Sequence, residues 1–106
     1  VHPDLKMIFG QADGIAMGAA KAVEGAGLTA QVTIGGYDGD GSALEYLAKC
    51  EGPFVVTATQ STRRMGVLAV DSALAVAAGQ QVPERQVSEA VLTTCENAAD
   101  FVANHP

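Results

Sequence analysis

Short apolar runs alternate with longer segments of helical periodicity along the whole chain. The short runs are unbroken in apolarity or rich in β-branched residues, which is typical of buried strands. They lie at residues 5–10, 32–37, 54–60 and 89–93. In the segments between them, apolar residues recur at the i, i+3, i+4 spacing of amphipathic helices. This alternation of strand and helix predicts an α/β fold with a parallel or mostly parallel sheet.

Residues that can cap a helix stand before each helical segment, where a side-chain oxygen can accept free backbone N–H groups. The second helical segment has an S-x-x-E capping box, formed by Ser42 and Glu45. The expected caps, in chain order, are Asp13, Ser42, Ser61 or Thr62, and Thr94. The helices are expected to end near Gly25, Lys49, Gly79 and Asn104.

Composition and charge exclude several classes of function. Apolar residues make up 48% of the 106 residues and charged residues 17%, which is typical of one globular domain. The net charge of −6 would repel a phosphate backbone, so nucleic-acid binding is not expected. The sequence contains no P-loop, no G-x-G-x-x-G after a strand and no arguable Ser–His–Asp arrangement, and residues 38–41 lack the spacing of a calcium loop. The sequence therefore offers no basis for an enzyme, a metal site or a cofactor.

Polar residues follow three of the expected strands. Asp13 comes after the first strand, and Asp38 and Gln60 come at the ends of the second and third. In open α/β sheets, ligands bind just beyond the carboxyl ends of the strands, so these side chains are candidates for a binding site. Each also has a structural explanation: Asp38 can belong to an Asp-Gly turn, Gln60 can face water and Asp13 can cap a helix.

The order and spacing of five segments resemble a known family. The segments are PDLKMIF (3–9), ADGIAMGAAKAVEGAG (12–27), VTIGGYDG (32–39), VVTATQ (55–60) and VLTTCENAADF (91–101). Together they are similar to the C-terminal part of the sugar-binding periplasmic proteins of bacterial ABC importers, the ribose- and galactose-binding group with the type I periplasmic binding protein fold. The resemblance implies a C-terminal fragment of a longer, two-lobe protein that resides in the periplasm.

The resemblance also implies an incomplete, three-layer, Rossmann-like lobe. Residues 1–60 would form strands and helices of the C-terminal lobe, 61–80 the crossover helix of the other lobe, and 81–106 the return strand and terminal helix. The last strand would run away from the cleft, which would place Cys50 and Cys95 at the same distal end of the lobe. An oxidising periplasm would permit a disulfide between them.

The function implied by the resemblance is the binding of a monosaccharide or related polyol for the membrane permease of an ABC importer, without catalysis or cofactor. In the family, the aspartate of the strand-end DG and a glutamine in a T-x-x-Q position contact the sugar, roles that would fall to Asp38 and Gln60. The family often has Asn-Asp where this chain has Ala12 and Asp13, so one expected contact is missing and the identity of the sugar is in doubt. Asp13 stays a candidate ligand residue as well as a candidate cap. Since Tyr37 alternates away from Asp38 on its strand, the aromatic platform for the sugar ring is expected from residues outside this chain.

Two other interpretations of the pattern stay open. The effector-binding core of a LacI-type repressor shares the fold but would need a helix-turn-helix upstream. A flavodoxin-like receiver with Asp38 as phosphoacceptor would need further acids after the first strand and a lysine after the third, and only Asp13 fits that requirement.

The long helix at 61–80 leads to an expectation about the isolated chain. Its apolar stripe consists of Val67, Leu68, Val70 and Leu74. Without the other lobe this stripe would face water, which soluble monomers rarely tolerate. The isolated chain is therefore expected to bind sugar weakly and to associate with a second copy, unless the helix folds back onto its own sheet.

Overall fold

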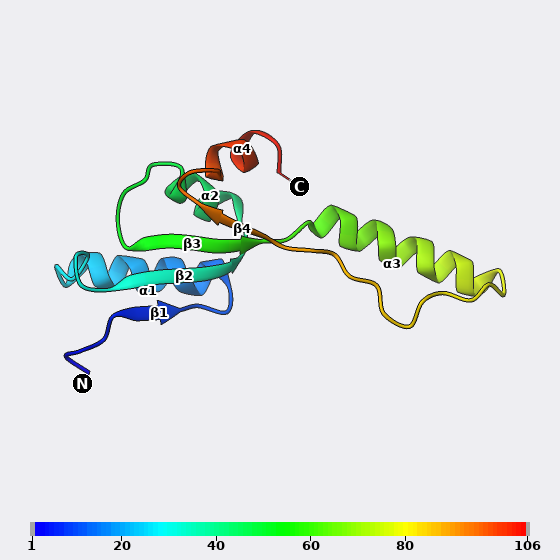
Figure 1. Cartoon of the computed structure of the whole chain (residues 1–106), viewed down its shortest axis with the longest axis horizontal. Helices are drawn as coiled ribbons and strands as arrows, with labels where there is room; N and C mark the ends of the chain where they lie inside the picture. Colours follow the sequence, from blue (N-terminus) through cyan, green and yellow to red (C-terminus); the bar gives the residue numbers. More distant parts are fainter. Residues whose placement is uncertain (1, 106) are drawn as a thin grey trace.

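Three parallel strands and one antiparallel strand form a sheet within residues 2–105, the part of the chain that the computed structural model describes. The strands are β1 (Met7–Phe9), β2 (Thr33–Asp38), β3 (Phe54–Thr59) and β4 (Val91–Thr94). They are arranged in the order β1-β2-β3-β4, with β4 antiparallel to β3 (Figure 1). The predicted mostly parallel α/β fold is therefore confirmed, and the expected strands are found with slightly different ends.

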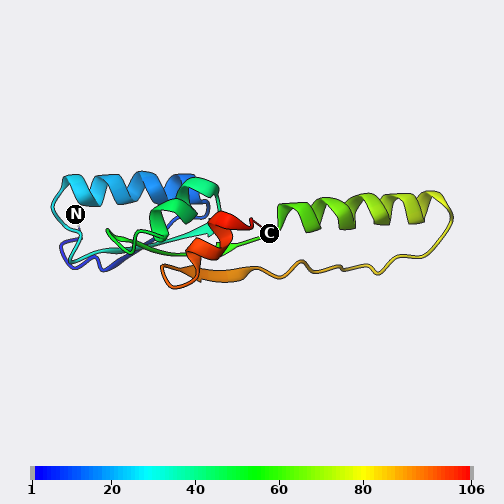
Figure 2. The same ribbon diagram turned by 90° about the horizontal axis from the view of Figure 1, so that it is seen from above.

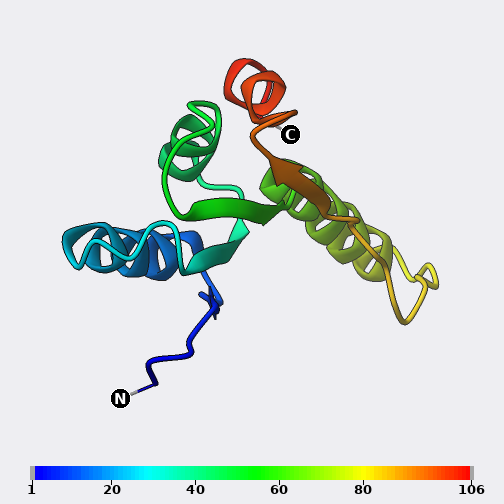
Figure 3. The same cartoon turned by 60° about the vertical axis from the view of Figure 1, so that its left-hand side comes forward.

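Three helices cover one face of this sheet, and a fourth extends away from it. The helices are α1 (Asp13–Gly25), α2 (Gly41–Leu47), α3 (Thr62–Ala77) and α4 (Ala98–Ala103). Figure 3 shows α1, α2 and α4 grouped on the same side of the strands. The core between these helices and the sheet consists of Ala16, Ala20, Val23, Val32, Ile34, Ala43, Leu47, Phe54 and Ala98.

The opposite face of the sheet is open. Strand side chains alternate between the two faces, and those on the helix side, such as Ile34 and Phe54, are buried. Those on the other side are exposed, among them Phe9, Tyr37 and Leu92, of which Leu92 is 68% exposed. Residues 2–105 thus supply two of the three layers expected for the complete lobe.

The α3 helix and the extended segment after it project from one end of the sheet (Figure 1 and Figure 2). No residue of α3 is buried, and Val67, Val70 and Leu74 are more than half exposed. The helix contacts the returning segment instead, where Gln86 Nε2 donates a 2.6 Å hydrogen bond to Ser72 Oγ. The alternative in which the helix folds back onto its own sheet is therefore not adopted. None of the helices in residues 2–105 has the length and apolarity that a membrane span requires.

The helix starts agree only in part with the predicted caps. Ser61 caps α3 as expected, since its Oγ accepts a 3.1 Å hydrogen bond from the backbone N–H of Arg64. The predictions for Asp13, Ser42 and Thr94 are wrong. A capping side chain must directly precede the helix to reach its first free N–H groups, and these residues lie one to three positions from that place. The N-cap residues of α1, α2 and α4 are Ala12, Asp40 and Asn97.

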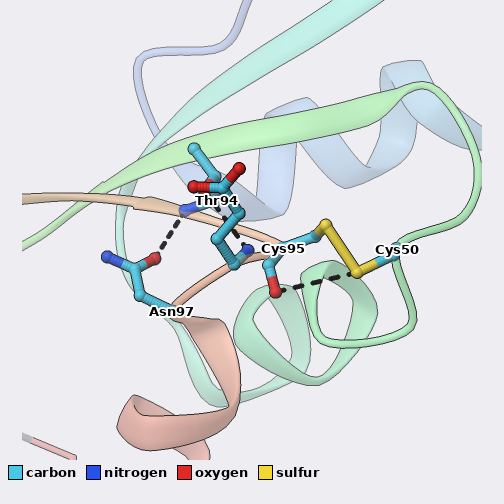
Figure 4. The surroundings of a disulfide bond; sticks show 5 residues. Cys50, Thr94, Cys95 and Asn97 are labelled. Atoms are coloured by element: carbon cyan, nitrogen blue, oxygen red, sulfur yellow. Dashed lines mark hydrogen bonds between the residues drawn. A yellow bond between two sulfur atoms is a disulfide. The ribbon is translucent and has the colours of Figure 1, made fainter.

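A disulfide between Cys50 and Cys95 joins the turn before β3 to the turn after β4 (Figure 4). The two Cα atoms are 5.0 Å apart, within the normal range for a disulfide. Because β3 and β4 are antiparallel, the start of β3 lies beside the end of β4. The disulfide is therefore at the opposite end of the strands from Asp38. Beside the bond, the backbone N–H of Thr94 donates to Asn97 Oδ1 at 2.9 Å. The pairing that the resemblance suggested is present.

Candidate functional site

Asp38 and Gln60 lie next to each other at the carboxyl ends of β2 and β3. The two strands pair with Asp38 opposite Thr59, so the residue after Thr59 comes beside the end of β2. Gln60 Nε2 donates a 2.7 Å hydrogen bond to Asp38 Oδ1, and the Gln60 backbone N–H donates to the Asp38 carbonyl at 3.0 Å. Both side chains are partly exposed. The prediction that they share one rim of the sheet is confirmed.

Asp13 lies inside the protein, where its carboxylate contacts the loop that follows Asp38. Its side chain is only 1% exposed. Oδ2 accepts hydrogen bonds from the backbone N–H groups of Gly39 at 2.8 Å and Asp40 at 2.9 Å, and Oδ1 accepts one from Thr57 Oγ1 at 2.7 Å. Asp13 therefore supports the loop after β2 from inside the protein, and direct contact between this carboxylate and a ligand stays a prediction.

The backbone around Asp38 has an unusual conformation. Asp38 has φ of 118° and Gly39 has φ of 79°, a region that side-chain-bearing residues rarely adopt. A Cβ atom on Gly39 would also overlap Thr59, and a Cβ atom on Gly36 would overlap Asp13 Oδ1. The two glycines therefore allow the loop and the buried carboxylate to pack closely against β3.

Two residues that contact this loop or its support were missed in the sequence. Thr57 lies in the expected strand 54–60 and was not singled out there, although a polar side chain on the buried face of a strand indicates that it needs a partner. His105 Nε2 lies 2.8 Å from the carbonyl oxygen of Gly39, across 66 residues of sequence. No local pattern around His105 could have indicated this contact.

The rim offers both hydrogen-bond acceptors and donors to a polar molecule. A carboxylate supplies only acceptors, whereas a primary amide supplies both donors and acceptors. A hollow of about 480 Å³ lies beside Gln60, between α3 and the segment 82–88. Within residues 2–105, no group of three or more His, Cys, Asp or Glu side chains is arranged to hold a metal ion.

Sequence comparison identifies relatives of this chain. Residues 1–81 match the family described as periplasmic binding protein domain. The D-ribose/D-allose-binding protein of Pseudomonas aeruginosa is 37% identical over 95 residues, which are 90% of this chain and 29% of that protein.

Solved structures show the same similarity. A solute-binding protein of an ABC transporter from Mycobacterium smegmatis, with bound glycerol, has a TM-score of 0.86 and 34% identity over 95% of this chain and 34% of its own. A periplasmic solute-binding protein of an ABC transporter from Actinobacillus succinogenes, with bound D-allose, has a TM-score of 0.83 and 31% identity over 93% of this chain and 34% of its own. The chain thus spans about a third of the length of these relatives. It belongs to the periplasmic binding protein domain family.

Proposed function

We propose that this chain is part of a longer, two-lobe solute-binding protein, called the parent protein below, which binds a monosaccharide or related polyol for a bacterial ABC importer. The observation that carries this proposal is the hydrogen-bonded pair of Asp38 and Gln60 at the carboxyl rim of the sheet. A carboxylate can accept charge-assisted hydrogen bonds from two neighbouring hydroxyl groups. The molecules named for the relatives, D-ribose, D-allose and glycerol, all carry such hydroxyl pairs.

The site residues have different roles in this proposal. Asp38 accepts hydrogen bonds from sugar hydroxyls, and Gln60 orients Asp38 and makes a further contact through its amide. Asp13 belongs to the same site but lies beneath the loop. Ala12, at the N-cap of α1, has no side-chain hydrogen bond, so the sugar contact that the resemblance implies from an asparagine at this position is missing.

The arrangement of the lobes is also part of the proposal. Residues 1–60 belong to the C-terminal lobe, 61–80 form the crossover helix of the other lobe, and 81–106 contain the return strand and terminal helix. The absence of any buried residue in α3 supports a partner surface outside residues 2–105. The open face of the sheet supports a further covering layer.

The parent protein binds and delivers its ligand and performs no catalysis, because the family consists of binding proteins. Its partner is the membrane permease of the importer, and its location is the periplasm. The disulfide between Cys50 and Cys95 supports an oxidising compartment. The LacI-type alternative is not favoured, because the relatives described above are solute-binding proteins of transport systems.

The test is isothermal titration calorimetry of the full-length parent protein with D-ribose, D-allose, D-galactose and glycerol. We expect one of these compounds, or a close stereoisomer, to bind one to one. A parent protein that binds none of them, and instead binds an operator DNA or turns over a substrate, contradicts the proposal.

A further inference from the structure

All hydrogen bonds of the buried Asp13 carboxylate lead to the loop that carries Asp38 or to the strand beside it. Oδ2 accepts from the N–H groups of Gly39 and Asp40, and Oδ1 accepts from Thr57 Oγ1. From this geometry we propose that Asp13 is a positioning residue, which holds the loop 38–40 in the shape that binds sugar. The inference rests on the function proposed above and specifies how the site is held ready.

The conformation of the loop explains why it needs such a restraint. A residue other than glycine with φ of 118°, as at Asp38, lies in a sparsely populated region and persists only when its surroundings hold it there. The two N–H groups that follow Asp38 both point at the same carboxylate oxygen. Without that oxygen these donors lose their partner, and the backbone is free to relax to an ordinary φ.

The restraint on the backbone also fixes the Asp38 side chain. The Asp38 carbonyl and Oδ1 both accept hydrogen bonds from Gln60, which follows β3. Thr57 lies on β3, and its hydroxyl donates a hydrogen bond to Asp13 Oδ1. Asp13 therefore ties the end of β2 to the interior of β3, and Gln60 ties it at the surface.

The protein has made room for this carboxylate. Gly36 has no Cβ, and a Cβ there would overlap Asp13 Oδ1. Burying a charge is costly unless hydrogen bonds compensate it, and here three donors surround one carboxylate. These buried hydrogen bonds hold the loop beside a candidate binding residue. Such a restraint is expected in a pre-organised site, because a loop that is already ordered loses less conformational entropy when a ligand binds.

The inference is tested with Asp13→Ala and Asp13→Asn in the full-length parent protein. Apparent affinity falls in proportion to the fraction of protein whose site is competent, so we expect Asp13→Ala to weaken sugar binding about 10-fold or more. Asp13→Asn should weaken it only about 3-fold, because its oxygen can still accept from the two N–H groups and its N–H can donate to Thr57. Hydrogen exchange at Gly39 and Asp40, measured without sugar, should accelerate in Asp13→Ala.

Tyr46→Phe is the matched control. It removes the hydrogen bond from the Tyr46 hydroxyl to the carboxylate of Glu24. Glu24 lies on α1, as Asp13 does, but at the other end of that helix, away from the loop. Its sugar affinity and its exchange at Gly39 and Asp40 should equal those of the wild type. If Asp13→Ala does not fold, Thr57→Val takes its place, since it releases the anchor of Oδ1 and should give a smaller loss of affinity with faster exchange.

Three results would overturn the inference: Asp13→Ala with wild-type affinity, Asp13→Ala with unchanged exchange at residues 39 and 40, or an equal loss in Tyr46→Phe. A failure of the proposed function is distinguishable from these, because the wild-type parent protein would then bind no sugar. In that case the role of the loop in sugar binding falls too, while the exchange data still decide whether Asp13 restrains it.

Discussion

Gln60 Nε2 donates a 2.7 Å hydrogen bond to Asp38 Oδ1, although the two residues are 22 positions apart, Asp38 at the end of β2 and Gln60 directly after β3. The bond engages one carboxylate oxygen and thereby sets the direction of the other. The backbone N–H of Gln60 holds the Asp38 carbonyl as well. Asp38 is thus a fixed acceptor at the rim of the sheet, as a sugar-binding carboxylate needs to be.

Replacement of Asp38 tests its direct role. In the parent protein, Asp38→Ala should reduce the binding free energy of the sugar by about 1.5–3 kcal/mol, the scale of a hydrogen bond to a charged group. Isothermal titration calorimetry measures this loss. Glu51→Ala removes an exposed carboxylate before the start of β3, at the opposite end of that strand from Gln60, and should leave the affinity unchanged. Unchanged affinity in Asp38→Ala would reject the role.

The orientation of Asp38 by Gln60 is tested by introducing a like charge. Gln60→Glu places a second carboxylate within hydrogen-bond distance of Asp38 Oδ1, where two negative charges repel each other. We expect it to weaken sugar binding about 10-fold at neutral pH, more than Gln60→Ala does. Equal affinities for Gln60→Glu and the wild type would show that Gln60 does not orient Asp38 for the ligand.

The disulfide is expected to stabilise the fold without affecting the site. Cys50 and Cys95 are separated by 45 residues, and closing a loop of that size stabilises a protein by about 2–4 kcal/mol. Cys50→Ser with Cys95→Ser should lower the free energy of unfolding in urea by this amount, as should reduction of the wild type. Sugar affinity should not change, since the bond lies at the far edge of the sheet from Asp38. Two free thiols in the denatured, unreduced protein would show that the bond does not form.

The raised pKa of Tyr46 leads to the prediction that the free energy of unfolding falls at high pH. Burial, together with the hydrogen bond that its hydroxyl donates to Glu24 Oε1, raises the pKa of Tyr46 from 10.0 to about 12. A pKa that is higher in the folded state means that the stabilisation is complete below pH 10 and is lost as the pH rises through about 12. Tyr46→Phe should lower the free energy of unfolding by about 1 kcal/mol at neutral pH.

The difference between wild type and Tyr46→Phe should shrink across that alkaline window. Urea unfolding of both proteins at a series of pH values measures it, and comparison of the pair cancels the titration of all other groups. A difference that is constant up to the highest pH would contradict the assignment.

The isolated chain is expected to associate. Val67, Val70 and Leu74 are more than half exposed on α3, and Phe9, Tyr37 and Leu92 lie on the open face of the sheet. Light scattering should therefore detect dimers or larger species, and binding of sugar should be weak. Val70→Glu with Leu74→Glu should reduce the association if it proceeds through α3. A clean monomer with micromolar sugar affinity would contradict the proposal that α3 needs a second lobe.

The sequence by itself determined the kinds and order of the elements and two residues of the candidate site. Apolar runs and helical periodicity depend only on neighbouring positions, so they identified the strands and the mostly parallel sheet. Because the carboxyl ends of parallel strands meet at one edge, the positions of Asp38 and Gln60 in the chain were sufficient to place them together. Ser61, one of the two residues expected to cap α3, could be identified locally as well, because a cap acts on the residues directly after it.

Tertiary structure alone decided what each polar side chain binds. Asp13 has the residue type of a cap, yet its carboxylate reaches N–H groups 26 and 27 positions away and a hydroxyl 44 positions away. Those distances depend on how closely α1, β2 and β3 pack, which a local pattern does not contain. The contact between His105 and the Gly39 carbonyl is of the same kind. Local patterning reports burial and periodicity, whereas the support of a binding loop depends on which distant atoms the packed layers bring within hydrogen-bond distance.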